Sequence, residues 1–375
     1  MKDPELIDHT KWLPSDMLER FMAEVFRGVG VPDADARVCA DVLITADRRG
    51  ISSHGVSRLK PIYYDRIVRD RVQRATTNFE IVRDFKSTAV VDGHHGMGMV
   101  IAKRCMEMAI AKAREFGSGV VVARNSTHFG IAGYYTLMAS HAGMIGLVST
   151  NARPAIAPTF GVENMLGTNP VVFGFPTDEP FDFTNDYATS IIQRGTVELY
   201  AREHRPLPPG VVIDHAGNVK TDANEVLLDL IAGKAALAPV GGVGEETGGY
   251  KGYGFATVAE LLSCALQQGA FMQQLAGLSD GKKVPYQLGH FFMAIDVEAF
   301  APQADFRKKV GDVLRALRAS RKAPGCNRIY TCGEKEHDAS RERARTGIPV
   351  DESIQVELIA MRNELGLKQY RFPFE

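Results

Sequence analysis

The sequence has little charge imbalance and no long apolar run, and each shortage excludes a class of protein. Its 375 residues include 44 Lys and Arg and 45 Asp and Glu, a formal net charge of −1. No basic excess therefore favours nucleic acid as a partner. Apolar runs such as residues 119–123 have the length of a strand and are too short to cross a bilayer. We expect a small-molecule partner, no nucleic acid and no membrane.

Cysteine is also scarce, and its positions do not form a pattern. There are five cysteines, an odd and scattered set in which Cys326 and Cys332 are not spaced like zinc ligands. Residues 1–5 carry charges and a proline rather than the apolar core of a signal peptide. We expect a reduced, cytoplasmic protein with no bound metal.

The most concentrated chemistry lies at residues 51–58, Ile-Ser-Ser-His-Gly-Val-Ser-Arg. His54 titrates near neutral pH and can carry a proton. Arg58 offers a planar fork suited to a carboxylate, and Ser53 can hold the imidazole or a substrate oxygen. A helix expected from about 57 to 72 would place Arg58 in its first turn. The stretch suggests a site that binds a small carboxylic acid and moves a proton beside it, and the alternative is an ordinary polar turn.

Strand and helix patterns alternate along the chain, which is typical of an α/β protein. Two strands are expected at 79–85 and 87–91, followed by a glycine-rich turn and a helix at 99–116. That turn lacks the third glycine of the Rossmann dinucleotide fingerprint, because Ile101 stands after Gly96 and Gly98. We therefore do not expect a Rossmann fold.

Three further loops carry polar or glycine-rich sequence. Residues 125–130 place His128 just after an expected strand, where α/β proteins carry their chemistry. Residues 154–176, and the glycine cluster 241–254 that contains Lys251 and precedes a helix expected at 255–266, offer backbone N–H groups to an anion. Both glycine-rich segments can equally be plain surface loops.

Taken together, these motifs resemble the malate/L-lactate dehydrogenase family of the second type, which includes ureidoglycolate dehydrogenase, sulfolactate dehydrogenase, diketogulonate reductase and an imine reductase acting on cyclic imino acids. They occur in the family's order and extend over roughly residues 15–350. The matching stretches are 53–58, 92–93, 125–134, 167–170, 188–190 and 251–254.

The resemblance implies an α/β fold that binds a nicotinamide cofactor without a Rossmann domain and begins with a helical segment. We expect residues 1–75 to form that segment, 76–125 with 300–375 a substrate-side α/β domain, and 126–299 a cofactor-binding domain. A homodimer is also implied.

The resemblance further implies a set of site residues. His54 and His128 match histidines that the family places at the reacting carbon. From the residues themselves, we expect Ser53 and Arg58 to act beside them and Tyr63 or Tyr64, on the helix after Arg58, to line the pocket unless it belongs to the core. The cofactor, NAD or NADP, is expected against Thr150, Asn151, Gly167, Thr168, Asn169, Asp186, Ala188, Thr189, Ser190 and Lys251. Two departures leave the nucleotide open: a long stretch at 244–249, and Cys332-Gly333-Glu334 where the family favours Pro-Gly-Glu.

The expected reaction is transfer of a hydride between the nicotinamide and a small 2-hydroxy or 2-keto acid, similar to malate or lactate. Reduction of a cyclic imine carboxylate, or oxidation of a ureidoglycolate-type acid, would use the same residues. A non-catalytic carboxylate-binding protein is the alternative of another class.

Overall fold

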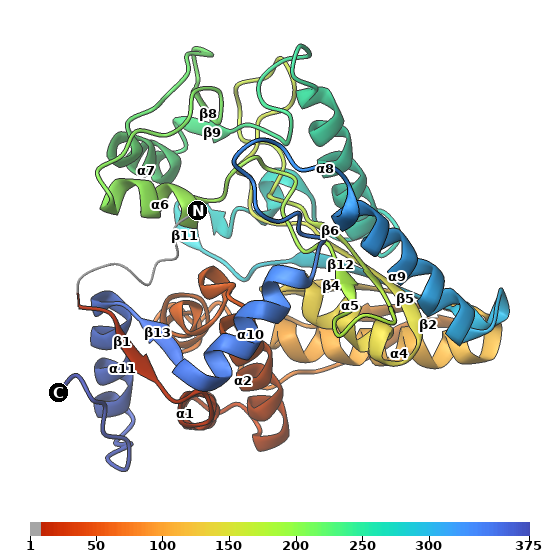
Figure 1. Cartoon of the computed structure of the whole chain (residues 1–375). Helices are drawn as coiled ribbons and strands as arrows, with labels where there is room; N and C mark the ends of the chain where they lie inside the picture. The colour runs from red at the N-terminus through yellow and green to blue at the C-terminus, as the bar shows by residue number, and fades with distance from the viewer. Residues whose placement is uncertain (1–8) are drawn as a thin grey trace.

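The computed structural model describes residues 9–375, apart from the side chain of Arg202. One layer consists of α1 (Ser15–Gly28) and α2 (Asp33–Arg48), which pack against α11 (Glu352–Glu364) from the other end of the chain. The short strands β1 (Lys11–Leu13) and β13 (Ile348–Val350) pair antiparallel beside them (Figure 1). Apolar residues at helical spacing, such as Leu18, Phe21, Met22 and Val25, are buried in this layer.

A seven-stranded sheet forms the centre of the molecule, in the order β2-β3-β4-β12-β5-β6-β7. Its strands are β2 (Glu80–Phe85), β3 (Thr88–Asp92), β4 (Ser118–Ser126), β12 (Leu288–Asp296), β5 (Met144–Thr150), β6 (Val171–Phe175) and β7 (Phe183–Thr184). Only β3 and β4 pair in parallel, and the other neighbours are antiparallel. This sheet differs from the parallel sheet of a Rossmann fold. The expected α/β class without a Rossmann domain is therefore confirmed.

Helices cover both faces of this sheet. The helices α4 (Gly98–Phe116) and α5 (Ala132–His141) pack on one face, and α8 (Gly249–Cys264) packs against β12 and β5 from the other (Figure 1). The approach is closest at two glycines. A Cβ on Gly119 would lie 2.1 Å from the Ala109 carbonyl oxygen of α4, and one on Gly289 would lie 1.6 Å from the Ser263 carbonyl oxygen of α8.

A smaller unit lies above the sheet in Figure 1. It has its own apolar cluster, which includes Ile156, Val197, Val226 and Leu237. Its elements are α6 (Arg194–Arg202), β8 (Val212–Asp214), α7 (Ala223–Ala232) and β9 (Ala235–Leu237). As expected for an N-cap, the Asp222 carboxylate accepts hydrogen bonds from the first backbone N–H groups of α7.

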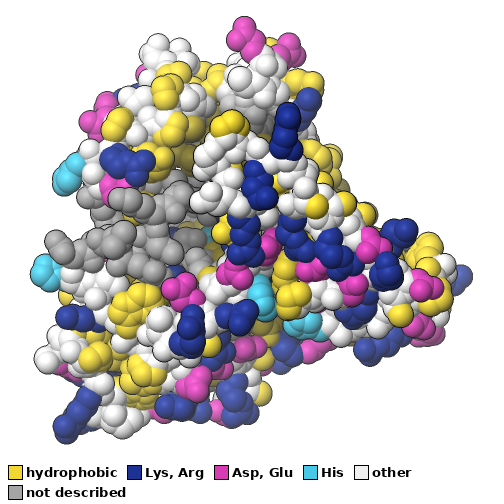
Figure 2. Space-filling view, in the orientation of Figure 1, with side chains coloured by type: hydrophobic (Ala, Val, Ile, Leu, Met, Phe, Trp, Pro, Cys, Tyr) yellow, Lys and Arg dark blue, Asp and Glu magenta, His cyan; other side chains and the backbone are white. Residues whose placement is uncertain are grey.

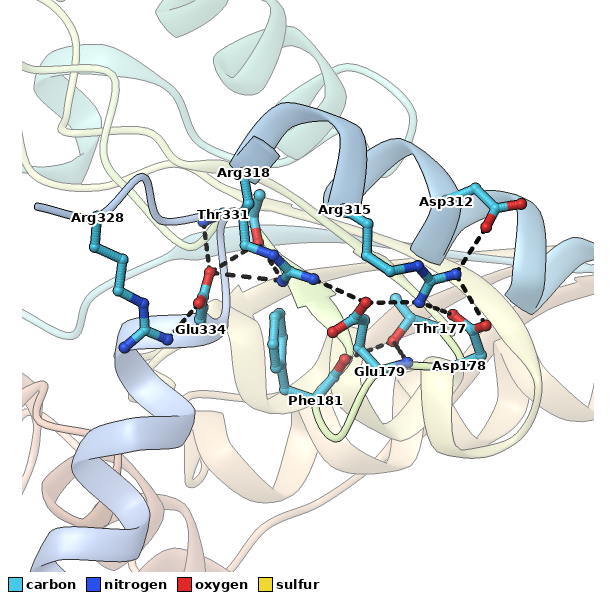
Figure 3. A network of polar contacts seen from close by, with 10 residues as sticks. All are labelled: Thr177, Asp178, Glu179, Phe181, Asp312, Arg315, Arg318, Arg328, Thr331 and Glu334. Carbon is cyan, nitrogen blue, oxygen red and sulfur yellow. Dashed lines mark hydrogen bonds and ion pairs between the residues drawn. The ribbon is translucent and has the colours of Figure 1, made fainter. Parts of the chain in front are cut away.

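The remaining elements lie along the edges of the molecule. They are the hairpin β10 (Leu278–Ser279) and β11 (Lys282–Lys283), and the helices α9 (Gln303–Ala319) and α10 (Glu334–Thr346). Arg315 and Arg318 of α9 bind carboxylates before β7 and at the start of α10 (Figure 3). Figure 2 shows Lys and Arg side chains interspersed with Asp and Glu over this part of the surface.

Two expected helices differ from the structure. The helix expected at 57–72 is instead a 3₁₀ turn (Val56–Arg58), a π-helix (Leu59–Tyr64) and the short α3 (Asp65–Val68). The helix expected to begin at residue 255 begins at Gly249, inside the glycine cluster. Glycine is a weak helix former, but Gly249 and Gly252 lie so close to backbone oxygens of the 240–244 turn that a Cβ on either would clash.

The expected domain division stays a prediction. The boundary near residue 125 falls inside β4, and β5 and β12 from the expected cofactor domain share the sheet of β2 and β3. Among residues 9–375, no helix is long and apolar enough to span a bilayer. The same part of the chain contains no group of three or more His, Cys, Asp or Glu side chains able to hold a metal ion.

Candidate active site

The Ser-His-Gly stretch forms two consecutive 3₁₀ turns, Ser52–His54 and Val56–Arg58, directly after α2. Asp47 of α2 holds them in place, since its Oδ2 accepts a hydrogen bond from the Val56 N–H at 2.8 Å. A Cβ on Gly55 would lie 2.0 Å from Asp47 Oδ1. Glycine is therefore required where the loop passes over this buried carboxylate.

His54 and His128 lie together although they come from different parts of the chain. Their rings are nearly parallel, with centroids 5.8 Å apart. Ser53 Oγ lies 2.9 Å from His54 Nδ1, and the Tyr63 hydroxyl lies 2.6 Å from His128 Nδ1. Within the described chain no hydrogen bond occupies Nε2 of either ring, so these nitrogens remain for a ligand.

Both imidazoles are held neutral by their surroundings. Burial lowers the pKa of His54 to about 4, and the Arg58 charge adds to this shift. Burial also lowers the pKa of His128 well below its usual value, helped by the charges of His54, Arg66 and Arg58. Desolvation disfavours the charged form of a base. At neutral pH each ring can therefore accept a proton.

Arg58 lies beside the imidazoles with most of its donors unused. Its Nε donates to the Ser53 carbonyl oxygen at 2.5 Å. Among the described residues no carboxylate lies within ion-pair distance of it, although the charges of Glu198 and Glu357 partly oppose the lowering of its pKa by burial. The N-terminal end of α6 closes over it, because a Cβ on Gly195 would lie 3.7 Å from Arg58 Nη2. The guanidinium is thus available to an anion.

The two tyrosines named from the sequence have different surroundings. Tyr63 is fully buried, with its ring edge against Phe26 and its hydroxyl on His128. The Tyr64 hydroxyl instead donates to Glu364 of α11 at 2.6 Å. Both lie in the π-helix, a conformation that often marks functional sites. Only Tyr63 joins the imidazole pair.

Three of the residues expected at the cofactor have side chains that bind other parts of the protein. Thr150 Oγ1 lies 2.7 Å from His290 Nδ1, and the Asn151 amide bonds to Ala270 and Gly289. Asn169 is also buried, and its amide bonds to Ala152 and to Glu260. These side chains shape the loop around 167–170, so a cofactor there would contact backbone groups.

The side chains of the segment from Asp186 to Ser190 face different parts of the protein. Asp186 accepts a hydrogen bond from Gly133 N–H at 2.7 Å, at the start of α5, and burial raises its pKa to about 6. The Thr189 N–H donates to the Thr168 carbonyl oxygen at 2.9 Å, and Ala188 before it is buried. Ser190 Oγ is buried and has no hydrogen-bond partner in the described residues, which marks a place where a polar ligand group fits.

Lys251 lies in the first turn of α8, near the expected glycine-rich segment. It is exposed, and its Nζ lies 5.6 Å from the Tyr250 ring centre. The N-cap residue of α8 is Gly248, so no side chain caps the first N–H groups. An ammonium and a helix N-terminus together suit a phosphate group. The residues present therefore fit a dinucleotide cofactor.

Some residues at the site were not identified from the sequence. His290 of β12 is fully buried between Ser126 and Thr150, with its ring stacked on Phe129. It sits in a strand pattern, with no polar neighbour to single it out. Asp47 was hidden in the apolar pattern of α2, and Arg66 was one of several arginines in a basic segment.

Comparisons with known proteins agree with this geometry. Residues 13–359 match the family model described as malate/L-lactate dehydrogenase. A malate dehydrogenase of Pyrococcus horikoshii is 40% identical over 358 residues, which cover 95% of this chain and 96% of that protein. An L-sulfolactate dehydrogenase of Methanocaldococcus jannaschii is 34% identical, covering 93% and 96%.

Among solved structures, a malate dehydrogenase from Entamoeba histolytica superposes with a TM-score of 0.92 at 39% identity, covering 97% of this chain and 99% of that one. The chain belongs to the malate/L-lactate dehydrogenase family, which confirms the resemblance inferred from its motifs.

Proposed function

We propose that the protein is an NAD(P)-dependent dehydrogenase of small 2-hydroxy acids. The observation that carries this proposal is the pair of neutral imidazoles, each with Nε2 unoccupied by protein, next to the unpaired guanidinium of Arg58. Such an arrangement suits a carboxylate whose neighbouring carbon carries an oxygen that gains or loses a proton. Similarity to malate and L-sulfolactate dehydrogenases supports it.

The nicotinamide, when bound, supplies or accepts the hydride at that carbon. In oxidation, His54 Nε2 accepts the hydroxyl proton, and in reduction it returns a proton to the carbonyl oxygen. Ser53 holds the other nitrogen of this ring. His128, fixed by Tyr63, orients the substrate oxygen or shares the proton transfer. Arg58 holds the carboxylate by a charge-assisted hydrogen bond.

For the cofactor, we propose binding between the loop 167–170, the segment 186–190 and the start of α8. The Lys251 ammonium and the α8 N–H groups would hold the phosphates, and the cofactor would supply a hydrogen-bond partner for Ser190 Oγ. NAD is the proposed nucleotide, with NADP as the alternative. A homodimer in the cytoplasm is the proposed setting.

The direct test is oxidation of NADH and NADPH with oxaloacetate, pyruvate, 3-sulfopyruvate and a cyclic imine carboxylate as acceptors, with His54→Asn as the background control. We expect turnover with at least one 2-keto acid and a clear preference for one nucleotide. Turnover of the cyclic imine alone would contradict the 2-hydroxy acid assignment. Absence of both turnover and nucleotide binding would contradict the dehydrogenase itself.

A further inference from the structure

Arg343 of α10 is a buried cation that contacts the start of the loop carrying His54. It is 2% exposed, although Arg345 in the same helical turn is exposed. Its Nη1 donates to the Asp47 carbonyl oxygen at 2.5 Å and to Ser52 Oγ at 3.1 Å. Burying a guanidinium is costly unless its N–H groups find acceptors. Arg343 finds them near the other end of the chain, beside the candidate active site.

Both acceptors belong to the junction between α2 and the Ser-His-Gly loop. Asp47 lies in the last turn of α2, and its carbonyl oxygen also accepts the Gly50 N–H at 3.0 Å. Ser52 is the first residue of the 3₁₀ turn that ends at His54. A cation at the C-terminal end of a helix interacts favourably with the last carbonyl groups and with the helix dipole. Arg343 thus joins the end of α2 to the turn that carries the imidazole.

The loop is attached to the protein at a second point, on the other side of His54. There the Asp47 carboxylate accepts the Val56 N–H at 2.8 Å. Within the loop, Ser57 Oγ donates to the Ser52 carbonyl oxygen at 2.7 Å. His54 lies between the two attachments, at Ser52 and at Val56. Loss of the contact with Arg343 would therefore free the first turn on its N-terminal side.

The helix that carries Arg343 is itself firmly placed. Ala339 precedes Arg343 by one turn and lies on the same side of α10, and a Cβ on Gly50 would lie 3.1 Å from the Ala339 Cβ. Directly after α10, a Cβ on Gly347 would lie 2.5 Å from a carbonyl oxygen of β1. At its other end, α10 begins at Glu334, whose carboxylate belongs to the ion-pair network of Figure 3. A helix held in this way can hold the loop.

We propose that Arg343 is a positioning residue for His54, which holds the first turn of the Ser-His-Gly loop so that the imidazole meets the substrate oxygen. The proposal rests on the proposed function, because His54 must be the group that transfers the proton. A shift of about 1 Å in a positioned group can lower a rate about 10²-fold. Arg343 acts through Ser52 and Asp47, so its loss should lower kcat and leave binding of substrate and cofactor nearly unchanged.

The first test compares Arg343→Met with Arg343→Lys, using the 2-keto acid that the wild type reduces fastest. Methionine keeps an apolar stem and removes the donors, whereas the lysine ammonium supplies up to three. We expect kcat to fall about 10- to 100-fold in Arg343→Met, with KM and the Kd for NADH within about threefold of the wild type. Arg343→Lys should recover part of kcat.

Arg345→Met is the matched control, because Arg345 stands in the same turn of α10 and is exposed. Its kcat should equal that of the wild type. A wild-type kcat in Arg343→Met, or a loss that Arg345→Met shares, would overturn the positioning role.

A second variant addresses the route from Arg343 to the loop. Ser52→Ala removes one of the two acceptors and should lower kcat about 3- to 10-fold, the effect of one hydrogen bond. Because both residues act through one contact, the effects of Arg343→Met and Ser52→Ala on ln kcat should not add in the double variant. Additive effects would contradict the route through Ser52. If Arg343→Met does not fold, an unchanged kcat in Ser52→Ala overturns the proposal by itself.

Amide hydrogen exchange separates failure of this proposal from failure of the proposed function. The His54 N–H donates to the Ile51 carbonyl oxygen at 2.9 Å, so its exchange reports on the first turn without any substrate. Exchange in residues 50–58 should be faster in Arg343→Met than in the wild type, with β4 unchanged. Equal exchange would refute the positioning role whatever the turnover. If the wild type reduces no 2-keto acid but exchange rises, the proposed function fails and the placement of the loop by Arg343 stands.

Discussion

Two arginine-containing regions of this molecule are built in opposite ways. Beside α9, Arg315 binds Asp178, Glu179 and Asp312 at 2.7–3.1 Å, and its side chain is 43% exposed (Figure 3). At the candidate active site, Arg58 and Arg66 are half-buried, and within the described residues no carboxylate pairs with either.

The difference separates charged groups that join surface elements from charged groups that are available to a ligand. Exposed ion pairs contribute little to stability, and salt screens them, so the α9 network fastens surface elements without chemical consequence. Unpaired, half-buried cations beside neutral imidazoles lower stability, and such perturbed groups gather at functional sites. Substitutions in the two regions should therefore have very different effects.

The largest expected effect is on turnover at the imidazole pair. His54→Asn should lower kcat about 10²–10⁴-fold, the range for loss of a positioned acid or base, while leaving cofactor affinity and thermal stability close to those of the wild type. Steady-state kinetics and nucleotide titration measure this. A kcat within threefold of the wild type would remove His54 from the role.

The next effect concerns Asp47 beneath the Ser-His-Gly loop. Burial raises the pKa of Asp47 from 3.8 to about 7. The stability that the protonated carboxyl contributes is therefore fully present below about pH 4 and is lost as the pH rises through 7. Asp47→Asn keeps an acceptor for the Val56 N–H and removes the charge. Denaturant unfolding should show the variant more stable by on the order of 2 kcal/mol at pH 8 and nearly equal at pH 4.

A matched variant sharpens that result. Asp312→Asn, in the exposed network, should show no such gain at pH 8, because the pKa of Asp312 is lowered rather than raised. If Asp47→Asn is destabilised at pH 8, the buried carboxylate is ionised and stabilising, contrary to this account.

A smaller effect is expected from Tyr63. Tyr63→Phe removes the hydrogen bond to His128 while keeping the buried ring, so kcat should fall about tenfold, in line with the loss of one hydrogen bond. The control is Tyr64→Phe, whose lost partner is Glu364, and its kcat should be unchanged. Equal effects on kcat would mean that the tyrosines act through packing alone.

The smallest effect is expected in the α9 network. Arg315→Ala should lower the free energy of unfolding by no more than about 1 kcal/mol, less at high salt, and should leave kcat/KM unaltered. A loss of turnover as large as that of His54→Asn would erase the contrast between the two regions.

The sequence indicated a chemistry for the site but not how the site is assembled. Ser53, His54 and Arg58 are close in sequence, so their types and spacing alone suggested carboxylate binding and proton transfer. The contact of His54 with His128 depends on tertiary packing, which no local pattern encodes. The π-helix could not be predicted either, and it decides that Tyr63 rather than Tyr64 meets His128.

For the expected cofactor residues, the sequence could not distinguish side chains that form hydrogen bonds inside the protein from side chains that are available to a ligand. Asn151 and Asn169 were expected at the cofactor because the resemblance to the family implies them, yet their amides are occupied by buried hydrogen bonds. The fold class was predictable because strand and helix patterns alternate and the Rossmann fingerprint is incomplete. The order of the sheet was not, because β12 inserts between β4 and β5 from far along the chain.

The pH dependence of kcat/KM for the wild type in both directions tests most directly whether the neutral, half-buried imidazoles carry the proton. With the pKa of His54 at about 4, oxidation should be constant from pH 5 to 8, because the base is already neutral. Reduction should fall tenfold per pH unit over the same range, because it needs the protonated ring. An inflection near 6.5, the ordinary pKa of histidine, in both directions would contradict the account.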